Sequence, residues 1–192
     1  MNTLKESLFS EAVIPSVTSL EDIHFVLKHT ALPWICLKMG DINSLASIIT
    51  LLHKNNRKVM VHQDSIKGIA KDKEGIAFLK RIGADAIITM KSQNLKMIRE
   101  GDILAVLGAF IVDSSALAQT VANIKSGKPD AVLIMPMTVP SKVYKRLLQE
   151  HDCILAGGLG AEHDTIQQSL DNGSLACIVS DRKRITETYL NK

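Results

Sequence analysis

A glycine-rich segment at residues 156–160, with the sequence AGGLG, is the part of the chain best suited to binding an anion. Successive glycines let the backbone approach a ligand closely and present several N–H donors to it. We therefore predict a phosphate-binding turn at Gly157 and Gly158. A turn that needs glycine only for a positive φ would show the same sequence, and this alternative stays open.

Polar side chains directly follow several short apolar runs. Lys38 and Lys91 are candidate charge partners for a phosphate, and Lys91 is expected to lie beside the glycine turn. The backbone of the turn after Ser180 is expected to bind the same anion. Either lysine could instead form a Schiff base, as in an aldolase. His62 and Asp64 could act as an acid–base pair, as half of a metal site, or in ordinary hydrogen bonding to a ligand. Since no third ligand has a suitable spacing, we predict neither a metal nor another cofactor.

Three basic segments, residues 54–58, 142–146 and 182–184, could contact nucleic acid or form solvated surfaces. The net charge is only +3, and the seven aromatic residues are scattered along the chain. Without a stacking platform, any RNA binding should be electrostatic and lie outside the ligand site, and a homodimer would double the basic surface. The candidate RNA-binding residues are Lys142, Lys145, Arg146, Arg182, Lys183 and Arg184.

The elements that must position these residues are eight short apolar runs, each followed by a segment with helical spacing. The runs are continuous rather than alternating in polarity, as in parallel strands that are covered on both faces. Asp113 is predicted to be a helix N-cap, and Ser19 with Asp22 resembles a capping box. The pattern predicts a small single-domain TIM (β/α)₈ barrel over residues 1–192, with His62, Lys91 and Gly157 at one rim. An open doubly wound sheet is the competing fold, but no GxGxxG follows the first run. The runs occupy residues 12–17, 34–38, 58–62, 86–90, 104–108, 131–135, 153–156 and 176–180.

The composition, with 46% hydrophobic and 22% charged residues among 192, indicates a globular domain with a substantial core. The three cysteines, Cys36, Cys153 and Cys177, lie in apolar runs without CxxC spacing, so we expect reduced core thiols on strands of a cytoplasmic protein. The longest apolar run, residues 103–112, is too short to cross a membrane, and the N-terminus shows no export signal.

Five motifs in order, VHQDSIKGI, IITMKS, FIVDSSAL, PDAVLIMP and ILAGGL, resemble the glycerol uptake operon antiterminator family. The resemblance extends from Val13 to Ser180. It implies a small TIM barrel that responds to glycerol 3-phosphate and prevents premature termination by acting on the leader mRNA of a glycerol-utilisation operon. Positions that match the family pattern are His62, Asp64, Gly68, Lys91, Ser92, Asp113, Ser114, Pro136, Gly157 and Gly158.

The sequence departs from that pattern at functional positions. Leu107 and Gly108 replace a glutamine–arginine pair, Leu133 replaces a glutamate, and Asp181 follows the predicted phosphate site, where a carboxylate is repulsive unless it points away. These departures indicate a diverged, non-catalytic member of the family. Two other functions compete with this interpretation: a phosphate-recognising aldolase or isomerase that uses Lys91 or the pair His62 and Asp64, and an interaction module that has lost its ligand.

Overall fold

Eight parallel strands form a closed barrel in the computed structural model, which describes residues 11–160 and 162–189. Each strand pairs with its neighbours in chain order, and β8 pairs with β1 to close the barrel. The predicted fold class is confirmed. The strands are β1 (Val13–Val17), β2 (Trp34–Leu37), β3 (Lys58–His62), β4 (Ala86–Thr89), β5 (Leu104–Phe110), β6 (Ala131–Met135), β7 (Ile154–Gly157) and β8 (Ala176–Val179).

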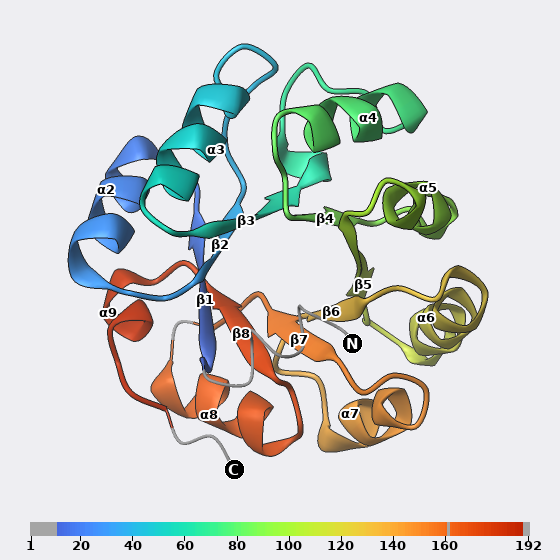
Figure 1. The fold of residues 1–192 in the computed structure, drawn as a ribbon. Coiled ribbons are helices and arrows are strands. Elements are labelled where there is room, and N and C mark those ends of the chain that lie inside the picture. Colours follow the sequence, from blue (N-terminus) through green and yellow to red (C-terminus); the bar gives the residue numbers. More distant parts are fainter. Residues whose placement is uncertain (1–10, 161, 190–192) are drawn as a thin grey trace.

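A helix follows every strand, and together the helices form a ring around the barrel (Figure 1). Side chains cap several of them: Ser19 Oγ accepts from the Asp22 N–H at 3.1 Å, and Asp113 Oδ1 accepts from the Ala116 N–H at 2.8 Å, as the sequence predicts. The helices are α2 (Leu20–His29), α3 (Leu45–Lys54), α4 (Lys73–Arg81), α5 (Leu95–Glu100), α6 (Ser114–Gly127), α7 (Ser141–Leu148), α8 (His163–Asp171) and α9 (Arg182–Ile185), with 3₁₀ turns η1 (Gln63–Ser65) and η2 (Ser92–Asn94). None of the described helices is long and apolar enough to span a membrane.

Alternation along the strands separates two hydrophobic layers. Ile14, Cys36, Met60 and Ile178 pack with one another inside the barrel, whereas their strand neighbours pack beneath the helices. Two positions further along the chain come Ser16 and His62, still on their strands, and Lys38 and Ser180, each directly after its strand. Because the side-chain period is two, these four polar residues continue the inward-facing rows at the carboxyl rim of the barrel. Since the strands are parallel, Gly157 and Lys91 lie at this same rim.

The three cysteines are buried and form no disulfide, but only Cys36 and Cys177 lie on strands. The expectation for Cys153 is wrong, because β7 begins one residue later, at Ile154. The backbone N–H of Cys153 donates to the ring nitrogen Nδ1 of His151 at 3.0 Å. Burial raises the pKa of the Cys36 thiol to about 11, so this cysteine is an unreactive core residue.

Candidate functional site

A cavity of about 340 Å³ lies at the carboxyl ends of four strands, where β7 and β8 meet β1 and β2. Its polar lining combines the Ser16 hydroxyl, the Lys38 ammonium group and the turns after β7 and β8. The volume fits a small metabolite rather than a polymer. The cavity is lined by Ser16, Lys38, Gly158, Leu159, Gly160, Ile178, Val179, Ser180 and Asp181.

The glycine turn has the conformation expected of a close backbone approach. Gly158 has a φ of +74°, and the nearest atom to a side chain built there would be Pro136 Cα at 3.8 Å. Glycine is therefore needed at this position for its conformation, not for lack of space. Gly157 differs, since it ends β7 and a side chain there would press against Leu133. Leu159, the next residue in the turn, also has a positive φ of 59° and is 71% exposed.

Lys38 is the cation that the fold brings to the glycine turn. Its side chain is half-buried, and no described carboxylate lies within 4.0 Å of its ammonium group. Lys91 is exposed and does not line the cavity, contrary to our expectation for it. The reason is topological: Lys91 follows β4, which lies across the barrel from β8, whereas Lys38 follows β2, next to β1.

Asp181 lines the cavity but directs its carboxylate to its own helix. Its Oδ1 accepts from the Arg184 N–H at 3.0 Å and thereby caps α9. A carboxylate that accepts from a helix N-terminus is partly neutralised by it. Ser16 also lines the cavity, although it is not among the predicted site residues. The sequence signal that could have identified Ser16 is its position, a single serine two residues after the inward-facing Ile14 in an otherwise apolar run. The Ser16 side chain is 4% exposed.

His62 and Asp64 lie on the adjoining part of the rim but do not form a pair. Ser65 Oγ lies 3.1 Å from His62 Nδ1, whereas Asp64 forms an ion pair with Lys71 and accepts from the Met90 N–H at 3.4 Å. Burial, and next to it the charge of Lys38, lower the pKa of His62 despite the opposing effect of Asp64, and both effects favour the neutral imidazole. The described residues contain no cluster of three potential metal ligands.

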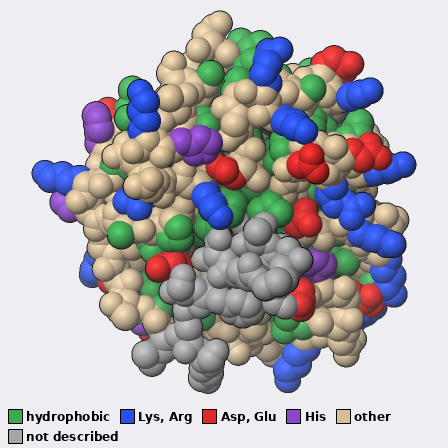
Figure 2. Space-filling view, in the orientation of Figure 1, with side chains coloured by type: hydrophobic (Ala, Val, Ile, Leu, Met, Phe, Trp, Pro, Cys, Tyr) green, Lys and Arg blue, Asp and Glu red, His purple; other side chains and the backbone are tan. Residues whose placement is uncertain are grey.

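The predicted RNA-binding arginines are largely occupied within the protein. Arg182 donates to Asp22, Arg184 to Glu187 at 2.6 Å, and Arg146 to Glu150 at 2.6 Å. Acidic and basic side chains are correspondingly mixed over α7 and α9 in Figure 2. Lys142, Lys145 and Lys183 are exposed, and none of the three lies within 4.0 Å of a described carboxylate.

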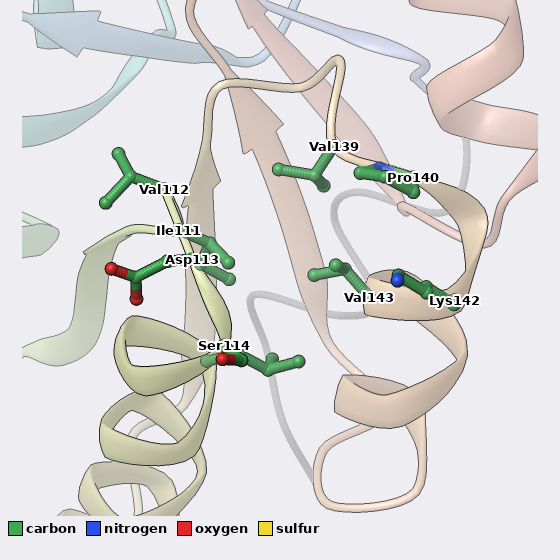
Figure 3. A pocket seen from close by; sticks show the side chains of 9 residues that line it. Ile111, Val112, Asp113, Ser114, Val139, Pro140, Lys142 and Val143 are labelled. Carbon is green, nitrogen blue, oxygen red and sulfur yellow. The ribbon is translucent and has the colours of Figure 1, made fainter.

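A second, mainly apolar groove of about 440 Å³ lies between the segments that lead into α6 and α7. Figure 3 shows Ile111 and Val112 on one side of it and Val139 and Val143 on the other. Its lining includes Lys142, a candidate RNA-binding residue, and Asp113 and Ser114, which match the family pattern, but none of the residues that line the polar cavity. The groove is therefore separate from the polar cavity.

Fold and cavity together define a class, the (β/α)₈ barrels with a cavity at the carboxyl ends of their strands, which is where barrels of this fold carry their functional sites. The sequence model of the glycerol-3-phosphate responsive antiterminator family matches residues 13–184, and the chain belongs to this family. The resemblance seen in the sequence motifs is confirmed.

Two solved structures support the assignment. The glycerol uptake operon antiterminator regulatory protein of Listeria monocytogenes is 26% identical, with a TM-score of 0.84 over 89% of this chain and 92% of that one. A glycerol uptake operon antiterminator-related protein of Thermotoga maritima is also 26% identical, with a TM-score of 0.83 over 92% and 99% of the two chains. Orotidine 5′-phosphate decarboxylase of Pyrococcus horikoshii, 18% identical with a TM-score of 0.65 over 88% of each chain, shares the fold alone. Among curated proteins, none matches this sequence.

Proposed function

We propose that this protein is a cytoplasmic transcription antiterminator that binds the leader mRNA of a glycerol-utilisation operon under the control of glycerol 3-phosphate. Family membership supports the regulatory role. The observation that carries the ligand proposal is the juxtaposition of Lys38 with the Gly158 turn in one cavity. A half-buried ammonium group beside backbone N–H donors is suited to a phosphate monoester.

In this proposal the phosphate lies against the turns after β7 and β8, with Lys38 as its charge partner and Ser16 as a further hydrogen-bond donor. Lys38 has no carboxylate partner in the described part of the chain. A bound anion would therefore be the charge partner of its ammonium group. Gly157 and Gly158 shape the turn, and Ser180 ends the inward row of β8. The site is a binding site, and no residue in it is assigned a catalytic role.

We further propose that this protein is a diverged member of its family. Gly108 and Leu133 occupy inward-facing positions of β5 and β6, and they offer no polar side chain to a ligand. A side chain at Gly108 would collide with the Met90 sulfur, which already fills that space. Leu107 packs outward beneath the helices and has no direct bearing on the ligand.

Ligand control requires that glycerol 3-phosphate bind the RNA-competent state with a different affinity from the other state. The proposal includes a homodimer, which would double the basic surface available to RNA. The molecular mass of the protein in solution, measured by sedimentation equilibrium, tests whether it forms this homodimer. RNA affinity measured with and without glycerol 3-phosphate tests the coupling and gives its direction.

Thermal unfolding with glycerol 3-phosphate, inorganic phosphate and glycerol tests the site itself. A ligand at 100 times its Kd stabilises the folded state by about 2.7 kcal/mol, and we expect this only with the phosphate compounds. Lys38→Met should abolish the stabilisation, and the matched variant Lys91→Met should retain it. The site would be rejected if both variants lost the ligand-induced stabilisation equally, or if no phosphate compound stabilised the parent protein.

The enzymatic alternative predicts a different result. A Schiff-base aldolase would form a covalent adduct at Lys91 when it is reduced with borohydride in the presence of dihydroxyacetone phosphate. An acid–base mechanism would need Asp64, whose carboxylate pairs with Lys71. A mass increase confined to Lys91 would favour the enzyme over the regulator.

A further inference from the structure

At the end of the barrel opposite the cavity, positive charge is concentrated where three consecutive helices end and lead into the next strand, from α2 to β2, from α3 to β3 and from α4 to β4. Residues 28–34, 53–58 and 80–86 contain a single acidic residue, Asp85. Its Oδ2 accepts from the Val59 N–H at 2.7 Å and lies 2.8 Å from His53 Nε2. We name the cations of these connections the basic sector, and they are Lys28, Lys54, Arg57, Lys58, Lys80 and Arg81.

The three connections form one continuous surface. Arg57 Nη2 donates to the Thr30 carbonyl at 2.5 Å, and the Lys58 N–H donates to the Pro33 carbonyl at 2.7 Å. The Asp85 N–H donates to the Val59 carbonyl at 3.0 Å, which joins the third connection to the second. Helices α2, α3 and α4 are likewise consecutive around the ring in Figure 1. The six cations therefore present a shared field rather than isolated charges.

Helix dipoles do not account for this distribution. A cation at a helix C-terminus is favourable, but the crossover helices all run in the same sense relative to the strands, so the preference is equal in every sector. The end of α8 and the connection after it, residues 171–176, have Asp171 and no cation. The last turn of α7 does carry Lys145 and Arg146, but Glu150 and Asp152 follow it, and Arg146 donates to Glu150. Arg57 and Lys58 lie outside the helices altogether. The asymmetry is thus a property of the surface and not of helix capping.

Most cations of the basic sector are available to a polyanion. Lys28, Lys54 and Arg81 are exposed and have no carboxylate within 4.0 Å in residues 11–160 and 162–189. Lys80 has only a distant one, Asp102 at 3.9 Å. By contrast, Arg182 and Arg184 are held by carboxylates of their own chain. Charge availability therefore favours the basic sector over α9.

We propose that the basic sector is the surface that contacts the RNA backbone, an inference that rests on the proposed function and names its RNA-binding face. Trp34 is 1% exposed, with Lys58 Nζ 5.4 Å from its ring centroid, and Arg81 lies 5.3 Å from the ring of Phe78. The ring of Trp34 is buried and that of Phe78 is half-buried with Arg81 beside it, so the contacts we propose are to phosphates rather than to stacked bases. The RNA then binds at the opposite end of the barrel from the ligand.

Two charge-matched triple variants test the inference. The first is Lys28→Gln, Lys54→Gln and Arg81→Gln, and the control is Lys142→Gln, Lys145→Gln and Lys183→Gln. Binding of an RNA hairpin and of a poly(U) oligonucleotide is measured across a salt series. We expect the first variant to lose about 0.7–0.9 in the slope of log affinity against log salt for each contact removed, and the control to keep the parent slope.

The possible failures are distinguishable. An unchanged slope in the first variant, or a reduced slope in the control, overturns the basic sector and leaves the antiterminator function standing. A parent protein that binds neither RNA at low salt overturns both proposals. Retention on phosphatidylserine-containing vesicles without RNA binding would assign the surface to membranes instead and would also overturn the inference.

Discussion

Arg182 and Asp22, 160 residues apart in the chain, are joined by two hydrogen bonds to the same carboxylate oxygen: Nη2 donates at 2.8 Å and Nε at 3.2 Å. The contact links α9, which follows β8, to α2, which follows β1, at the point where the barrel closes. The guanidinium carbon of Arg182 also lies 5.4 Å from the ring centroid of Phe25. Arg182 is therefore a structural residue of the closure.

The Asp22 carboxylate should make stability depend on pH. Burial alone would raise its pKa, but hydrogen bonds from Arg182, Thr18 and Ser19 outweigh burial and lower the pKa to about 2. Because the folded pKa lies below the ordinary value of 3.8, this stabilisation is fully present above about pH 4, declines below it and is lost as pH falls through the folded pKa of about 2. We expect Asp22→Asn to cost about 1–2 kcal/mol at pH 7 and much less at pH 2, measured by urea denaturation. An equal cost at both pH values would contradict this assignment.

Gly158 should be required for its conformation. With a φ of +74° and open space around a built side chain, Gly158→Ala should cost about 1–2 kcal/mol through backbone strain alone. Gly158→Asn is the control, because asparagine is larger but tolerates the left-handed region better. Thermal unfolding should rank the parent above Asn and Asn above Ala. If Asn were the more destabilising, space rather than φ would limit the position.

The charge of Lys38 should be visible in the titration of His62. Burial is the main reason that the pKa of His62 is lowered, and the Lys38 charge is the next. Lys38→Met should therefore raise the pKa of His62, as read from the imidazole proton shifts by NMR. Lys91→Met should leave it unchanged, since Lys91 is not among the groups that shift it. A bound anion at Lys38 should also raise the pKa, and a titration curve insensitive to both would place Lys38 away from His62.

Tyr144 should stabilise the loop after β6 through its hydroxyl group. The fully buried side chain donates to the Met137 carbonyl at 2.7 Å and lies 2.8 Å from Ser169 Oγ, and its burial raises its pKa to about 12. Tyr144→Phe leaves that carbonyl unsatisfied and should cost about 1–3 kcal/mol in urea denaturation. In a double-mutant cycle, Ser169→Ala should cost less when it is combined with Tyr144→Phe than in the parent, and strict additivity would show that the two hydroxyls are uncoupled.

The eight apolar runs were sufficient to predict the barrel, because parallel strands covered on both faces must be continuously apolar and each needs a crossover helix. Local signals were equally reliable at Ser19 and Asp113, whose caps involve backbone groups only three residues away. The conformation at Gly158 was likewise one of the two interpretations that its sequence allowed. These features depend on short stretches of chain, so their sequences determine them.

Only the tertiary structure decided which residues share the cavity. Closure between β8 and β1 brings Ser16 and Lys38 to Gly158 and Ser180, while Lys91 lies across the barrel. It also pairs Arg182 with Asp22 and so removes an arginine that the sequence shows as part of a basic run. Residues more than a hundred positions apart meet through the register of the closed sheet. A side chain's type and spacing indicate what it can bind, but its partners are set by that register.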